Sequence, residues 1–216
     1  MGSVVHLIDA SQQRDDAYRA IGRYMVEFSA LIADMRNLTA GRITTAETQE
    51  RELIELAFGG LMAQQVADPF FAMCRTVADL DKAGCDIEKC LREQVKQEIE
   101  ERNRIAHGDW LVARWTHADL EVPTVALVRV KAADIKKPLK YENLTVSQID
   151  EICERVEILR HVVWEFGTIC TEQDSHDPSH GRPKISVSEA LQLEAKRVVF
   201  RPDAYKAAID TLLQDR

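Results

Sequence analysis

"EERNRIAHGDW" (residues 100–110) decides the fold, because the spacing of apolar residues changes there from a helical to a strand period. Before it, Leu91, Val95 and Ile99 recur every four residues, which predicts a helix over 86–107. Gly108 suits the position after a helix end. Beyond it, "WLVARW" (110–115) and "TVALVRV" (124–130) predict two strands of a hairpin. The stretch therefore predicts a β insertion at about 110–131, directly after a helix.

Further helices are predicted on both sides of this stretch by apolar residues at three- and four-residue steps. Asp68 and Pro69 resemble an N-cap and first helical residue, and Gly84 is expected to end that helix. Thr145 and Gln148 form a capping-box pattern that is expected to open a long helix. The expected helices are 11–37, with a break near Gly41, then 45–67, 68–84, 146–171, 187–197 and 202–213.

These elements predict a mainly α protein, a helical bundle with a small β-hairpin insertion and a C-terminal helical appendage. We expect residues 1–171 to form the bundle. Residues 172–216 are expected to be a polar linker followed by short helices.

The composition limits the classes of function. The 216 residues carry a formal net charge of −8, which argues against a general nucleic-acid coat but not against a local phosphate site. The apolar runs are too short for a membrane span, and we expect no secretory signal at the N-terminus. The five cysteines form an odd set without a C-x-x-C pair, which favours reduced thiols in the cytoplasm.

The quoted stretch also gathers residues suited to chemistry. Asn103 and His107 are four apart and share a helix face, whereas Arg102 continues the apolar stripe three residues after Ile99. Arg104 should point to solvent and pair with Glu100. An arginine on a burying face needs a carboxylate or an anionic ligand such as phosphate.

Arg102, Asn103 and His107 without a metal cluster suggest phosphodiester chemistry by acid–base catalysis. His107 would move the proton of a ribose 2′-OH, and Arg102 would stabilise charge on the phosphorus centre. Asn103 would orient His107 or bind a ligand oxygen. The structural alternative is an ordinary helix end, with His107 favoured by the helix dipole and Arg102 paired with a glutamate.

Arg102 and His107 are five residues apart, so their directions on an ideal helix differ by roughly 140°. One copy of the motif need not close a site by itself. Two copies meeting across a two-fold axis along this helix could close one.

"RNRIAHG" (102–108) resembles the R-N-x-x-x-H signature of the HEPN superfamily, the higher eukaryotes and prokaryotes nucleotide-binding domains. Arg102 matches the arginine, Asn103 the polar residue and His107 the histidine, over a bundle of about residues 11–171. The resemblance implies a metal-independent endoribonuclease that needs no cofactor. It also implies a homodimer whose two motifs line one cleft, and a role as a toxin or antiphage-defence effector.

The resemblance implies RNA as substrate and a cognate antitoxin or regulatory protein as partner. It also leaves an alternative, since some members have lost catalysis and only bind a protein, a nucleotide or RNA. One branch has a tyrosine two residues after the histidine, where this chain has Asp109. Regulation through that tyrosine is therefore not expected here.

Other features carry weaker predictions. A basic cluster after the hairpin could hold an RNA backbone or could be a solvated loop: Arg129, Lys131, Lys136, Lys137 and Lys140. Trp110 and Trp115 could stack a base or belong to the core. His176 and His180, with Asp174 and Asp177, could be imagined around a metal, but Pro178 breaks the helical spacing, and we expect no metal site.

Overall fold

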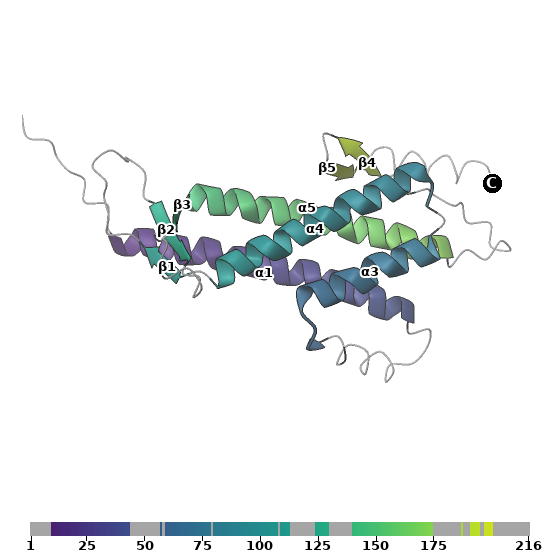
Figure 1. Cartoon of the computed structure of the whole chain (residues 1–216), viewed down its shortest axis with the longest axis horizontal. Helices are drawn as coiled ribbons and strands as arrows, with labels where there is room; N and C mark the ends of the chain where they lie inside the picture. The colour runs from purple at the N-terminus through teal and green to yellow at the C-terminus, as the bar shows by residue number, and fades with distance from the viewer. Residues whose placement is uncertain are drawn as a thin grey trace, which may run out of the picture. The chain divides into compact units, whose positions relative to one another are not determined.

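The structure is a computed structural model, and it describes residues 10–43, 57, 59–78, 80–107, 109–112, 124–129, 140–174, 187, 191–194 and 197–200. Within these ranges the protein is mainly α, as predicted, with helices and strands labelled in Figure 1. The helices are α1 (Ala10–Ile43), α3 (Ala63–Val77), α4 (Lys82–Ala106) and α5 (Val146–Asp174).

Several predicted helix ends are wrong. α1 continues through Gly41, where the break was expected. α3 begins at Ala63, before Pro69, because the side chain of Gln65 accepts a hydrogen bond from the backbone N–H of Met62 at 2.9 Å and caps the helix earlier. Pro69 therefore lies inside α3. The predicted helix over 45–67 is described only from residue 57, and its last residues, from Ala63, belong to α3.

α4 begins at Lys82, before Gly84, which was expected to end the preceding helix. The Asp81 side chain caps this helix by accepting the N–H of Gly84 at 2.6 Å. α3 has already ended at Val77. Because Asp81 caps α4, Gly84 lies in the first turn of α4 and not at the end of α3.

The start of α5 confirms the predicted capping box. The backbone N–H of Thr145 donates to the Gln148 side chain at 2.8 Å, and the N–H of Gln148 donates to Thr145 Oγ1 at 3.1 Å. The predicted apolar stripe of this helix is buried along its full length: Ile149, Ile152, Val156, Leu159, Val163, Phe166 and Cys170.

The predicted hairpin is present as β1 (Asp109–Val112) and β2 (Thr124–Arg129), paired antiparallel with Asp109 opposite Val128. A third strand, β3 (Lys140–Thr145), pairs with the other edge of β2. The lysines of this segment predict a solvated loop, but the segment pairs along the open edge of β2. Charged residues such as Lys140 and Glu142 are common on edge strands, where they discourage further pairing.

The C-terminal appendage differs from the prediction of short helices. β4 (Leu191–Glu194) and β5 (Arg197–Phe200) form an antiparallel hairpin. β4 and the first residue of β5 fall within the predicted helix 187–197. Val198, Val199 and Phe200 favour strands. α5 extends to Asp174, so the predicted linker starts later than expected. Residues 175–186 and the predicted helix 202–213 lie outside the described residues.

The chain divides into two compact units, one of Met1–Phe28 with Glu100–Val156 and the other of Ser29–Ile99 with Glu157–Arg216. In the first unit, Ala17, Tyr24, Ile105 and Ile149 are among the buried residues, and the Tyr24 and Phe28 rings lie 6.4 Å apart. The predicted separation of a bundle over 1–171 from an appendage over 172–216 stays a prediction.

The second unit has an aromatic core. Phe70 and Phe71 of α3 meet edge to face with ring centroids 5.1 Å apart, and Phe166 of α5 lies 6.5 and 6.3 Å from them. All three are fully buried. Gly167 lets this core close, since a Cβ there would meet Leu38 of α1 at 2.7 Å and Phe70 at 2.9 Å.

Candidate active site

The predicted motif lies at the C-terminal end of α4. The helix ends at Ala106, and the backbone N–H of His107 donates to the carbonyl of Asn103 at 3.1 Å, which closes the last turn. Gly108, the predicted residue after the helix, lies outside the described residues. The motif is therefore held on the final turn of a regular helix rather than on an irregular loop.

The buried face of α4 explains how the motif is presented. Leu91, Val95 and Ile99 are buried as predicted, and Ile105 is fully buried in the last turn. Ala106 is exposed, because Ile105 occupies the burying position at this end of the helix. Because Ile99 and Ile105 are buried, the helix cannot rotate about its axis. The directions of the polar residues between and after them are therefore fixed.

Arg102 is half-buried, in agreement with its position beside the apolar stripe. Its Nη1 donates a hydrogen bond to Asn103 Oδ1 at 3.1 Å. Among the residues whose side chains the structure describes, no carboxylate pairs with Arg102. The hydrogen bond of this guanidinium is with a neutral amide.

Arg104 behaves differently from the prediction. It pairs with Glu101 rather than Glu100, with Nε 2.9 Å from Oε2 and a second contact between Nη2 and Oε1. Its side chain is only 22% exposed and that of Glu101 only 19%, so neither extends freely into solvent. Glu101 lies three residues before Arg104, within reach of a fork-shaped pair along the helix. The two arginines of this turn are therefore not equivalent.

Asn103 and His107 are both exposed, four residues apart on the helix. Within the described part of the chain, the side chain of Asn103 contacts Arg102 and not the His107 ring. The sequence suggested that Asn103 orients His107 or binds a ligand oxygen, and its observed side-chain hydrogen bond is with Arg102. Among the three side chains, those of Asn103 and His107 are exposed and that of Arg102 is half-buried.

The predicted RNA-binding lysines are mostly beyond what the structure describes, since Lys131, Lys136 and Lys137 lie outside the described residues. Lys140 is the first residue of β3, and the strand register places its Cα opposite that of Arg129, the last residue of β2. Two members of the basic cluster thus share one end of the three-stranded sheet.

The weaker candidates are placed only in part. Trp110 lies in β1, and Asp174 is the last residue of α5. Trp115, His176, Asp177 and His180 lie outside the described residues. The described residues hold no group of three or more histidine, cysteine or acidic side chains arranged for a metal ion. The five cysteines, all of them described, form no disulfide.

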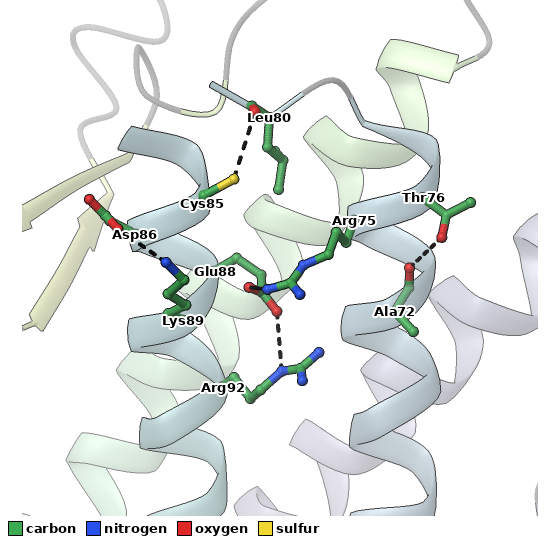
Figure 2. A network of polar contacts seen from close by, with 9 residues as sticks. All are labelled: Ala72, Arg75, Thr76, Leu80, Cys85, Asp86, Glu88, Lys89 and Arg92. Atoms are coloured by element: carbon green, nitrogen blue, oxygen red, sulfur yellow. Dashed lines mark hydrogen bonds and ion pairs between the residues drawn. The ribbon is translucent and has the colours of Figure 1, made fainter. Parts of the chain in front are cut away.

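A polar cluster that the sequence analysis did not single out lies between α3 and α4 (Figure 2). Glu88 of α4 is fully buried, yet it contacts two arginines, Arg75 of α3 and Arg92 of α4. The i,i+4 spacing of Glu88 and Arg92 is a sequence signal that was available, but the contact with Arg75 joins different helices and has no local signal.

The buried thiols are the other group with altered chemistry. Cys74 of α3 and Cys170 of α5 are fully buried and near one another. A hydrogen bond with the Cys170 side chain, together with burial and the nearby negative charge of Glu88, raises the pKa of the Cys74 thiol far above its ordinary value. Cys74 is therefore held as the neutral thiol, which is a poor nucleophile.

Comparison of the chain with family models, with curated proteins and with solved structures found no match. The similarity to HEPN domains thus depends on the residues of the motif and their place at the end of α4. No helix within the described ranges has both the length and the apolar character that a bilayer crossing requires.

Proposed function

We propose that this chain is a metal-independent endoribonuclease of HEPN type that acts as a homodimer, with a role as a toxin or antiphage-defence effector. The observation that carries the proposal is the contrast between two arginines in one helical turn. Glu101 pairs with Arg104, whereas Arg102 donates a hydrogen bond to the amide of Asn103 and pairs with no carboxylate whose side chain the structure describes. A positioned arginine without an acidic partner is suited to bind a phosphate.

His107 supplies the proton transfer in this proposal. It removes the proton from a ribose 2′-OH, and the 2′ oxygen attacks the adjacent phosphorus. The bond from phosphorus to the 5′ oxygen breaks, and the 5′ oxygen takes up a proton from a second acid or from water. The products are a 2′,3′-cyclic phosphate and a 5′-OH.

Arg102 stabilises the charge that builds up on the non-bridging oxygens of the phosphorus centre. Asn103 positions Arg102 through the 3.1 Å hydrogen bond, which reduces the motion that the guanidinium must lose when a phosphate binds. Because Arg102 and His107 diverge by roughly 140° on the helix, the proposal combines Arg102 of one copy with His107 of a second copy.

The experiment is an RNA cleavage assay with the purified full chain in excess EDTA, followed by analysis of the RNA ends. We expect cyclic phosphate ends from the wild type and at least about 100-fold less product from His107→Ala and from Arg102→Ala. Lys96→Ala is the matched control, because Lys96 is an exposed cation on the same helix. It should leave the rate unchanged.

Circular dichroism and size-exclusion chromatography would show that each variant keeps its fold and oligomeric state. RNA cleavage at the wild-type rate by either motif variant would overturn the proposal. Binding of RNA without any cleavage by the wild type would favour the alternative, a catalytically inactive HEPN-like module. The net charge of −8 is the feature that favours that alternative, since it weakens general attraction of RNA.

A further inference from the structure

The cluster of Arg75, Glu88 and Arg92 lies in the second unit and has no role in the proposed cleavage. Figure 2 shows Arg75 reaching from α3 toward α4, and Arg92 reaching from α4 toward α3, with the Glu88 carboxylate between them. Arg75 Nη2 lies 2.5 Å from Glu88 Oε2, and Arg92 Nε lies 3.1 Å from Glu88 Oε1. One carboxylate therefore holds two guanidinium groups close together.

The charges of this cluster do not balance. Two arginines and one glutamate leave one positive charge, and none of the described acidic residues other than Glu88 pairs with either arginine. The nearby Asp86 is engaged with Lys89 at 3.6 Å. A single arginine would be enough to neutralise a buried glutamate, so the second one needs another explanation.

Both guanidinium groups are positioned but accessible. Glu88 is fully buried, whereas the side chain of Arg75 is 53% exposed and that of Arg92 is 40% exposed. Arg92 also lies over the buried Phe71 ring, with its guanidinium carbon 5.5 Å from the ring centroid, which restricts its orientation. Each group is therefore held from its inner side and keeps outward N–H donors open to solvent.

The contact between Arg92 and Glu88 is also imperfect. The distance of 3.1 Å is that of an ion pair, but the Arg92 Nε–H is not aligned with Glu88 Oε1, and neither atom has a hydrogen-bond partner. A buried polar atom without a hydrogen bond is costly. Arg92 is thus paired with Glu88 by charge and not by a hydrogen bond from Nε.

We propose that Arg75 and Arg92, held by Glu88, form a binding site for a phosphate monoester group, distinct from the motif at the end of α4. A phosphate monoester carries close to two negative charges at neutral pH and offers three terminal oxygens to the outward N–H groups. The buried carboxylate sets the separation of the two forks before the ligand arrives. This inference is independent of the proposed ribonuclease activity.

The test is calorimetric titration of the full chain with inorganic phosphate at constant ionic strength. We expect one saturable site, and Arg75→Gln should weaken binding at least about tenfold, because one fork is lost. Arg75→Lys keeps the charge but not the fork-shaped guanidinium. Its affinity for phosphate should lie between those of the wild type and Arg75→Gln. Arg19→Gln is the matched control, because Arg19 is 76% exposed and pairs with Asp16 on the surface. It should bind like the wild type.

Titration with two further ligands shows which kind of phosphate compound the site prefers. A nucleoside 5′-monophosphate that binds more tightly than inorganic phosphate would identify a nucleotide as the natural ligand, and equal affinity would identify free phosphate. Dimethyl phosphate, a diester with a single charge, should bind at least about tenfold more weakly. Absence of saturable binding up to about 10 mM phosphate, or equal loss in Arg19→Gln and Arg75→Gln, would overturn the proposal.

Discussion

Arg102 donates a hydrogen bond from Nη1 to the side-chain oxygen of its neighbour Asn103, at 3.1 Å. Both residues lie in the last turns of α4, three and four residues after the buried Ile99. The contact gives Asn103 a definite task in the proposed site, which is to hold the charged group without neutralising it. The amide is suited to this task because it accepts a hydrogen bond but carries no charge.

Asn103→Asp tests this task with a nearly isosteric change. The new carboxylate would accept the same hydrogen bond from Arg102 but would also neutralise its charge. We expect RNA cleavage to fall at least about tenfold with no loss of thermal stability. Asn103→Ser, which keeps a neutral acceptor, should retain more activity than Asn103→Asp. Equal activity of Asn103→Asp and the wild type would contradict the assigned role.

The closeness of α1, α3 and α5 at Gly167 gives a prediction on stability. A Cβ in Gly167→Ala would lie 2.7 Å from Leu38 Cδ1 and 2.9 Å from a Phe70 ring carbon, which is inside van der Waals contact. We expect the free energy of unfolding to fall by about 1–3 kcal/mol, measured by urea denaturation.

Gly22→Ala is the matched control, because Gly22 also lies in a helix but has no atom within 4 Å of the added Cβ. This substitution should raise the free energy of unfolding by about 0.5–1 kcal/mol, since alanine is the better helix former. Similar effects of the two substitutions would show that the packing at Gly167 is not as close as described.

Glu88 predicts a second effect on stability. Glu88→Gln removes the charge that holds Arg75 and Arg92 but keeps the volume of the side chain. We expect a loss of about 2 kcal/mol in the free energy of unfolding, less than for a fully buried ion pair because both arginines are partly exposed. Asp16→Asn, which removes the surface pair with Arg19, should cost less than about 0.5 kcal/mol.

The raised pKa of Cys74 predicts a dependence of stability on pH. In the folded chain the thiol stays protonated, because its hydrogen bond with Cys170 and its burial disfavour the thiolate. In the unfolded chain the thiol loses its proton above its ordinary pKa of 9.0. The unfolded state therefore binds fewer protons at high pH, and the stability that is present below this pKa decreases as the pH rises above it.

The expected contribution of this one group is a loss of about 1.4 kcal/mol for each pH unit above the ordinary thiol pKa. Denaturation curves of the wild type and of Cys74→Ala between about pH 8 and 10.5 would separate it from the titration of other groups. The slope should be shallower in the variant by that amount. Identical slopes would contradict the assignment to Cys74.

The parts of the fold that the sequence predicted well are those with strong local signals. The Thr145–Gln148 capping box and the regular apolar spacing of α5 are both properties of a few neighbouring residues, and both are confirmed. The paired strands β1 and β2 were likewise visible from their alternating pattern. These features have signals in a few neighbouring residues, so they could be predicted without knowledge of distant contacts.

The parts that were missed depend on competition or on distant residues. Pro69 is typical of a helix start, but the hydrogen bond from Met62 to Gln65 starts α3 six residues earlier, at Ala63. The strand β3 is stabilised by pairing with the open edge of β2. At the candidate site, the sequence placed Arg102 on the apolar stripe, and its side chain is half-buried in the structure. The sequence could not foresee that Arg104 would pair with Glu101, because Glu100 and Glu101 both lie within helical reach.

The most direct measurement of the central claim is complementation between two inactive variants. Arg102→Ala and His107→Ala, mixed in equal amounts after partial unfolding and refolding, would form mixed dimers in which one composite site keeps both groups. Each variant alone should be inactive, and the mixture should recover about a quarter of the wild-type RNA cleavage rate in EDTA. A mixture that stays inactive although mixed dimers form, or full activity of either variant alone, would contradict the account.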